Sequence, residues 1–215
     1  MADVNYGELT TNPKAMLDLM DNALIMTGKL KNSTVYGRPQ MLKLVPDRVF
    51  RAYRKRRVRK NKTLEVLYLM HADGSPGFPS YILDYEKGQV SYQVLDREAN
   101  YCFTITMNGC TFGIGSPTPD GSVLVTHSNA HGNLEGGGEG VSQAMRQRAL
   151  ARAFHRPNVS LFEPDSYRKG NRNVTTFGIR TKGAWQFYYQ AYESAGGGSF
   201  RVYEAKKVKL TQFKG

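Results

Sequence analysis

The stretch VTTFGIRTKGAWQFYYQAY, residues 174–192, carries the pattern that decides the fold. β-Branched and aromatic residues fill its two halves, residues 174–180 and 185–192, as is typical of β-strands. Lys182 and Gly183 separate the halves and predict a tight turn, so the two strands are expected to pair. The same kind of pattern predicts further strands at residues 64–70, 81–85, 89–95, 101–107 and 200–209. The sequence therefore favours a largely antiparallel sheet.

Two segments show helical spacing instead. The first begins at Asn12 and Pro13 and ends at Gly28. The second covers residues 139–154, and one side of it is predicted to be lined by Val141, Met145, Ala149 and Ala153. No repeat, linker or low-complexity block divides the chain of 215 residues. We therefore expect one domain, residues 1–215, of the α+β class: a mixed or antiparallel β-sandwich flanked by helices.

The chain is strongly basic, with a formal net charge of +12, and much of this charge lies between Arg48 and Lys62. Such a run can attract an acidic protein, with Arg54, Arg56 and Arg57 at its centre. It can equally be a solvated loop or a charged edge strand, and both interpretations stay open. No helix-turn-helix, zinc finger or aromatic ribonucleoprotein motif accompanies the run, so a nucleic-acid partner is not expected.

Composition also bears on the compartment in which the protein works. No stretch approaches the run of ~20 apolar residues that spans a bilayer, so no membrane span is expected. The first residues lack the basic-then-apolar pattern of a secretory signal, and export would need another route. Cys102 and Cys110 would lie ~26 Å apart on one extended strand, too far for a disulfide. A reducing cytosol is the expected working environment.

A cysteine and a histidine flank a predicted hairpin. Strands at residues 111–115 and 122–126 are joined by a turn-rich segment and pair so that Cys110 falls directly opposite His127. Opposed residues of antiparallel strands lie ~4.5–5.5 Å apart at Cα and point to the same face. Such a pair can form a nucleophile and its base, because the imidazole takes the thiol proton and the resulting ion pair lowers the thiol pKa.

The surrounding residues complete this hypothesis and also limit it. Backbone amides at Asn108 and Gly109 are candidates for holding an oxyanion, and glycine lets the backbone approach closely. His131 is a rival base, ranked second because it lies in a predicted loop. A cysteine at a strand end is often a small buried apolar residue. Spacing alone therefore leaves a purely structural interpretation open.

A resemblance to a known family favours catalysis. The segment FTITMNGC, residues 103–110, resembles the strand that leads to the nucleophile in the Burkholderia lethal factor family. The Gly-Cys-Thr triplet, followed by a strand that ends in histidine, is similar to the catalytic domain of cytotoxic necrotizing factors and, more distantly, to chemoreceptor glutamine deamidases. Residues 178–181 and 185–190, with the glycine-rich loop that follows, resemble the C-terminal hairpin of the lethal factor family.

The resemblance implies a toxin or effector that deamidates glutamine through a single catalytic domain. Cys110 would be the nucleophile, His127 the base, and Thr104 would line the site. Asn108 stands where the relatives have serine. No metal and no organic cofactor would be needed. The partner would be a host protein in the host cytosol, either a Rho-type GTPase or a translation-initiation helicase, and the chain is expected to be a monomer.

Two other classes of function remain as alternatives. A cysteine protease or a transglutaminase would share the thiol chemistry and differ in the acceptor or in the carbonyl that is attacked. A basic nucleic-acid-binding protein would use the run from Arg48 to Lys62, bind in a salt-dependent way and tolerate loss of the thiol.

Overall fold

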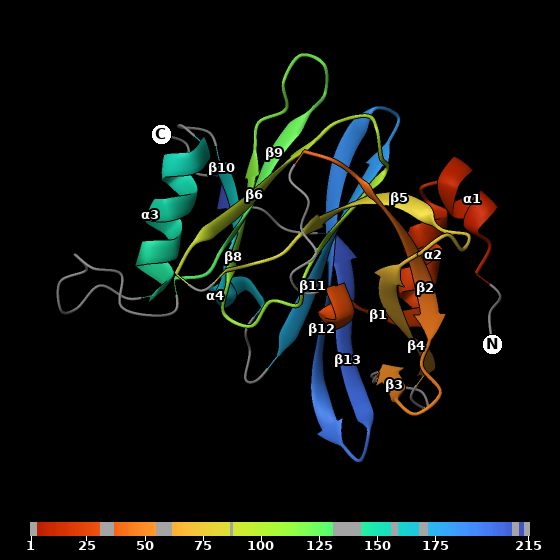
Figure 1. The fold of residues 1–215 in the computed structure, drawn as a ribbon. Coiled ribbons are helices and arrows are strands. Elements are labelled where there is room, and N and C mark those ends of the chain that lie inside the picture. Colours follow the sequence, from red (N-terminus) through yellow and green to blue (C-terminus); the bar gives the residue numbers. More distant parts are fainter. Residues whose placement is uncertain are drawn as a thin grey trace.

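The computed structural model describes residues 4–30, 37–54, 62–86, 88–130, 143–155, 159–167, 172–207 and 211–212. Within these ranges the chain is mostly β-structure (Figure 1). The largest element is a closed barrel of eight strands, in which β3 pairs with both β13 and β4. In order around the barrel the strands are β4 (Lys62–His71), β2 (Gln40–Pro46), β5 (Phe78–Leu83), β7 (Tyr101–Thr104), β11 (Asn173–Thr181), β12 (Ala184–Gly196), β13 (Ser199–Lys207) and β3 (Arg51–Arg54).

A short strand and a second sheet complete the β-structure. β1 (Ala23–Met26) runs parallel to β4. The second sheet has the order β14 (Thr211–Gln212), β10 (Val159–Phe162), β8 (Thr111–Gly115), β9 (Val123–Ser128) and β6 (Val90–Leu95). The chain passes from the barrel to this sheet between β7 and β8, where Gly109 has a positive φ of 93°. Only glycine adopts this backbone conformation without strain.

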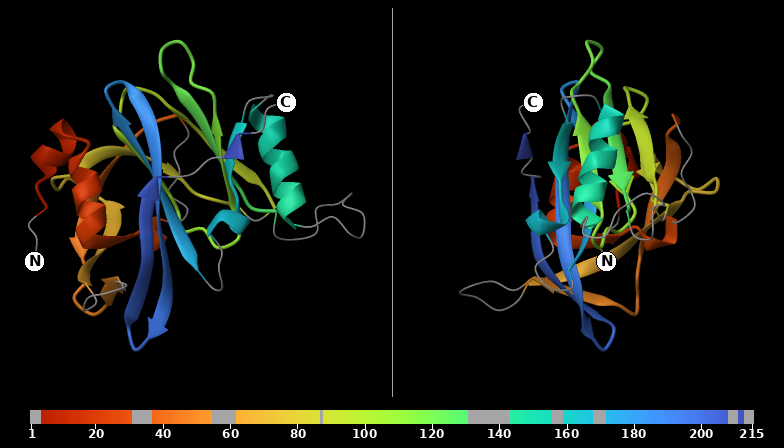
Figure 2. Two further views of the ribbon diagram at one scale, coloured as in Figure 1. Left: turned by 180° about the vertical axis from the view of Figure 1, so that it is seen from behind. Right: turned by 90° about the vertical axis from the view of Figure 1, so that its left-hand side faces the viewer.

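The helices α1 (Tyr6–Thr11) and α2 (Ala15–Asn22) lie at one end of the molecule and α3 (Gln143–His155) lies at the other (Figure 1). α1 and α2 lie beside the barrel, whereas α3 covers the second sheet on the far side (Figures 1 and 2). α4 (Pro164–Tyr167) follows β10, and a single 3₁₀ turn covers Gly28–Leu30. None of the helices in the described ranges has the length and apolar character needed to cross a membrane.

The two largest hydrophobic cores of the described residues lie inside the barrel and between the barrel and the second sheet. The barrel core combines strand residues with side chains of α1 and α2, among them Leu9, Met16, Leu42, Leu69, Phe78, Tyr101, Phe103 and Phe177. The inter-sheet core lies between one wall of the barrel and the second sheet, and includes Tyr81, Leu83, Cys102, Cys110, Phe112, Val125, Phe162, Tyr167, Phe187 and Tyr189. Gly178 permits close packing there, since a Cβ at this position would lie 3.1 Å from the Cβ of Cys102 and 3.1 Å from the Phe187 ring.

The predicted fold class, an α+β sandwich flanked by helices, is wrong. The described chain is mainly β, has few helices, and contains a closed barrel. Local patterning reveals strands and hairpins, and the hairpin of β11 and β12 is indeed present, with positive φ at Lys182 and Gly183 as a type I′ turn requires. Barrel closure depends instead on β3, which lies in the basic run. A charged edge strand was one interpretation of that run, but β3 is not an edge, because it pairs with both β13 and β4, and its Arg51 pairs with the distant Ser199.

The helix predictions also need correction. The first predicted helix ends at Asn22, because Ala23–Met26 joins the sheet as β1. On α3 the predicted apolar side faces solvent: Met145, Ala149 and Ala153 are exposed, and Val141 lies outside the described residues. Gln147 and Ala151 are buried in their place. A polar residue can occupy a buried helix position only when its hydrogen bonds are satisfied, and this condition is met at Gln147, as described below.

Candidate active site

Cys110 and His127 face the same core, although not in the predicted register. β8 pairs with β9 so that Phe112, not Cys110, lies opposite His127. The difference arises in the connecting loop, where the Thr118 amide donates to Ser122 O and forms a separate turn. A shift of two residues keeps each side chain on its face of the sheet. His127 therefore points with Val123 and Val125 into the inter-sheet core that contains Cys110.

His127 is completely buried and has one anchored ring nitrogen. Its Nδ1 lies 3.5 Å from Leu83 O on β5, and the Tyr85 ring lies 5.4 Å away, centroid to centroid. Nε2 has no hydrogen-bond partner within the described ranges. Burial lowers the pKa of His127 to about 4, against the smaller opposite effect of backbone hydrogen bonds at Leu83 and Asp84. The ring is therefore neutral near pH 7, and with the proton on Nδ1 the lone pair of Nε2 is free to act as a base.

Cys110 is also buried, with 4% of its surface exposed. Burial raises the pKa of its thiol to about 12, and a hydrogen bond from the Asn108 backbone acts in the opposite direction. Cys110 and His127 are thus both uncharged at rest. Burial in an apolar core thus disfavours both charged forms of the predicted thiolate–imidazolium pair in this state, and the ion pair stays a prediction.

The backbone around Cys110 is held by two side chains that the sequence analysis missed. The hydroxyl of Tyr167, on α4, accepts a hydrogen bond from Gly109 N at 3.2 Å and donates one to Cys110 O at 2.6 Å. On α3, Nε2 of Gln147 donates to Gly109 O at 2.9 Å, and its Oε1 accepts from Thr111 Oγ1 at 2.9 Å. Both side chains are buried. No sequence signal reveals them, because they lie in separate helices far along the chain.

Thr104 is placed beside the histidine anchor. It ends β7 directly across from Leu83, whose carbonyl oxygen contacts His127. The Thr104 hydroxyl is buried and accepts two hydrogen bonds from Thr176, one from its amide at 3.1 Å and one from its hydroxyl at 2.8 Å. In this state Thr104 ties β7 to β11, and its role in lining a substrate site stays a prediction.

The two residues predicted to hold an oxyanion differ in their surroundings. Asn108 is exposed, whereas Gly109 is buried. The Gly109 amide already donates to Tyr167, so it is not open to a second acceptor in this state. The Asn108 amide lies against the Cys110 thiol. Their part in catalysis stays a prediction.

Several other predicted residues lie outside the described ranges, namely the rival base His131 and two of the steering residues, Arg56 and Arg57. Arg54 is described, and its guanidinium contacts Asp21 Oδ1 and Met20 O, each at 3.3 Å. This arginine therefore links β3 to α2 as well as adding charge.

Other parts of the structure are weaker candidates for a functional site. Within the described ranges no group of three or more His, Cys, Asp or Glu side chains could hold a metal ion. Cys102 and Cys110 are both free thiols. They do not lie on one extended strand as predicted, because β7 ends at Thr104, and both pack in the inter-sheet core. One cavity, of about 320 Å³, lies at the loop end of β8 and β9 beside Trp185 and Phe187. It is away from the Cys110 end of the hairpin.

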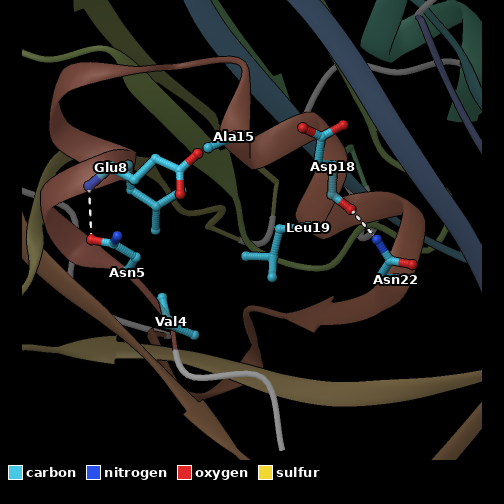
Figure 3. A pocket seen from close by; sticks show the side chains of 8 residues that line it. Val4, Asn5, Glu8, Ala15, Asp18, Leu19 and Asn22 are labelled. Carbon is cyan, nitrogen blue, oxygen red and sulfur yellow. Dashed lines mark hydrogen bonds between the residues drawn. The ribbon is translucent and has the colours of Figure 1, made fainter.

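A cavity of about 310 Å³ lies against α1 and α2 (Figure 3). Glu8 and Asp18 border it, and Val4 and Leu19 supply apolar side chains. Two of its polar contacts are local: Glu8 N donates to Asn5 Oδ1 at 3.0 Å, and Asn22 Nδ2 donates to Asp18 O at 2.7 Å. Neither cavity is lined by Cys110 or His127.

Comparisons with known proteins give little further guidance. No protein-family model matches the chain, and no curated protein matches it. Among solved structures the chain is similar to the C-terminal domain of CNFy from Yersinia pseudotuberculosis, with a TM-score of 0.33 and 11% identity, over 64% of this chain and 66% of that one. A similarity at this level does not establish a shared fold, and the chemistry has to be judged from the residues themselves.

Proposed function

We propose that this protein is a cysteine hydrolase that deamidates a glutamine side chain of another protein, as a toxin or effector would. The observation that supports this most directly is that Nε2 of buried His127 has no hydrogen-bond partner among the described residues. His127 shares its face of β9 with Val123 and Val125, which pack in one core with Cys110. A buried nitrogen without a partner costs stability. A residue kept at that cost is a candidate for a functional role.

The mechanism uses these two neutral groups. As the thiol of Cys110 attacks the glutamine carboxamide carbon, Nε2 of His127 takes the thiol proton. The resulting imidazolium gives that proton to the leaving ammonia, and the carbonyl carbon stays bound to sulfur as a thioester. A water molecule, deprotonated by the same nitrogen, then cleaves the thioester to glutamate and restores the thiol. The reaction consumes one water and releases one ammonia for each glutamine.

The burial of the pair sets a condition on this reaction. With Cys110 4% exposed, a glutamine side chain can reach the thiol only if the core opens on the substrate side. Asn108, two residues before Cys110, is exposed and marks a nearby surface from which access can begin. An apolar surrounding also strengthens the electrostatic interactions of the transition state once the substrate has displaced water.

The target is proposed from the sequence resemblance alone. Relatives of that kind act on a Rho-type GTPase or a translation-initiation helicase in the host cytosol, and we propose the same class of target and location here. The basic run from Arg48 to Lys62 is proposed to attract an acidic protein surface.

The test is peptide mass spectrometry of host-cell lysate after incubation with the purified protein, scoring glutamine-to-glutamate conversion. Cys110→Ser should lose the conversion while Cys102→Ser keeps it. Cys102 is a matched control, since it is buried in the same inter-sheet core and is also a free thiol. Conversion that persists in Cys110→Ser would rule out the proposal, and equal loss in both variants would indicate a structural role for the thiols.

The same experiment separates the alternative enzymes. Cleaved peptides in place of glutamate would indicate a protease, and amine-linked glutamines would indicate a transglutaminase. Salt-dependent nucleic-acid binding that persists in Cys110→Ser would favour the basic binding protein.

A further inference from the structure

We infer that Gln147 and Tyr167 are positioning residues for Cys110: together they clamp its backbone from two helices. The inference rests on the proposed function for its catalytic readout only. It begins with the position of the cysteine. Cys110 lies in the connection between the barrel and the second sheet, after Gly109 and before β8 begins at Thr111. A residue in such a connection lacks the ladder of hydrogen bonds that fixes a strand residue.

Side chains supply the missing constraints. Tyr167 and Gln147 together make four hydrogen bonds to Gly109, Cys110 and Thr111. Tyr167 acts from within the inter-sheet core, where its ring packs 5.1 Å from that of Phe162. Gln147 acts from α3, on the outer side of the second sheet. The backbone at the thiol is therefore held from both sides.

The two helices are also joined to each other. Arg148, next to Gln147, has its Nε 2.7 Å from Oε1 of Glu163, the residue directly before α4. This ion pair fixes α3 relative to the segment that carries Tyr167. Because Gln147 and Tyr167 are buried and use their polar atoms on one short backbone segment, their geometry is specific to the position of Cys110.

Loosening the clamp should lower the turnover number and raise the rate at which Cys110 is alkylated. A looser backbone lets the thiol shift relative to His127, and a misplacement of about 1 Å costs roughly a hundredfold in rate. The same loosening exposes the buried thiol, so a small reagent alkylates it faster. A role in general stability alone would not lower turnover while raising alkylation at a temperature where the protein stays folded.

Tyr167→Phe tests the clamp, because it removes both hydroxyl contacts and keeps the ring. Tyr101→Phe is the matched control: its hydroxyl is buried and donates to Leu9 O at 2.6 Å, but in the barrel core. Both variants are made in a Cys102→Ser background, so that iodoacetamide reports on Cys110. We expect Tyr167→Phe to lower kcat of deamidation by at least tenfold, to change KM by less than about threefold, and to speed alkylation. Tyr101→Phe should do neither.

A second pair of variants covers the case in which Tyr167→Phe does not fold. Thr111→Val removes the hydroxyl that donates to Gln147, and Thr111→Ser restores it. The serine variant should recover most of the turnover and the slow alkylation that the valine variant loses. If each clamp variant matches its control in both readouts, the clamp is overturned. If Cys110→Ser keeps activity, the proposed function fails, and faster alkylation of Cys110 in Tyr167→Phe still supports the clamp.

Discussion

Two buried polar side chains, Gln190 in the barrel and His127 in the second sheet, differ in how fully their hydrogen bonds are satisfied. Gln190, on β12, accepts a hydrogen bond from Ile25 N at 3.0 Å and donates to Met20 O at 2.9 Å and Ala23 O at 2.7 Å. It thereby satisfies the edge of β1 and the end of α2. His127, on β9, has its Nδ1 3.5 Å from Leu83 O, and its Nε2 has no hydrogen-bond partner in the described ranges. The amide of Gln190 therefore stabilises the fold, whereas Nε2 of His127 is available to act as a base.

The largest effect on stability should follow from Gln190→Leu. This change leaves Ile25 N and Ala23 O without this partner, whereas Met20 O keeps its contact from Arg54. Each unsatisfied buried group costs about 1–3 kcal/mol, so we expect the free energy of unfolding in urea to fall by about 2–6 kcal/mol. Gln186→Leu on the same strand is the control, since Gln186 is only partly buried, and it should change stability by less than about 1 kcal/mol. A small effect of Gln190→Leu would remove the contrast between the two residues.

The next effect is a dependence of stability on pH. The pKa of His127 is about 4 in the folded protein, below its ordinary value of 6.5. The unfolded chain therefore binds more protons between these values. The contribution of His127 to the free energy of unfolding is fully present above pH 6.5. It falls by up to about 3 kcal/mol as the pH decreases towards 4. Denaturant melts at pH 7 and pH 4.5 measure this loss, and the part due to His127 should be absent in His127→Leu.

At pH 7 the substitution His127→Leu should hardly change stability. It removes a nitrogen that has no partner, and Leu83 O keeps its other hydrogen bond, from Ile105 N at 3.0 Å. Replacing a poorly satisfied polar group with an apolar one of similar volume is nearly neutral, so a change within about 1 kcal/mol is expected. A loss as large as that of Gln190→Leu would show that His127 is a structural residue after all.

The smallest effect concerns the basic run. Arg54 pairs with Asp21 at 3.3 Å, and the carboxylate side chain is 66% exposed. Exposed pairs contribute about 0–1 kcal/mol and are screened by salt. Asp21→Asn should therefore lower stability by less than about 1 kcal/mol at low salt. High salt should remove the difference, and a loss unchanged by salt would contradict a surface interaction.

The sequence predicts the strands far better than it predicts how they assemble. Alternating β-branched and aromatic residues located the hairpin of β11 and β12, and positive φ at Lys182 and Gly183 matches the predicted turn. Closure of the barrel was missed, because β3 and β13 meet only through pairing of residues as distant as Arg51 and Ser199. Such contacts leave no periodic trace in the sequence.

The candidate site shows the same limit. The hairpin register was off by two residues, which leaves His127 on its predicted face of the strand, since side chains alternate with a period of two. The charge state of the pair depends on burial, which local sequence patterns do not reveal. Gln147 and Tyr167 were missed because their role depends on hydrogen bonds to Gly109 and Cys110, which form only when the chain folds.

The central claim, that His127 acts as the base for Cys110, is tested most directly by a double-mutant cycle on glutamine deamidation. Cys110→Ser, His127→Leu and the double variant are compared with the wild type by peptide mass spectrometry, at a pH where all four are folded. Groups that act as one unit are strongly non-additive. Each single variant should lose at least about a hundredfold in rate, and the double variant no more than the worse single one. Wild-type turnover in His127→Leu, or losses that multiply in the double variant, would contradict the account.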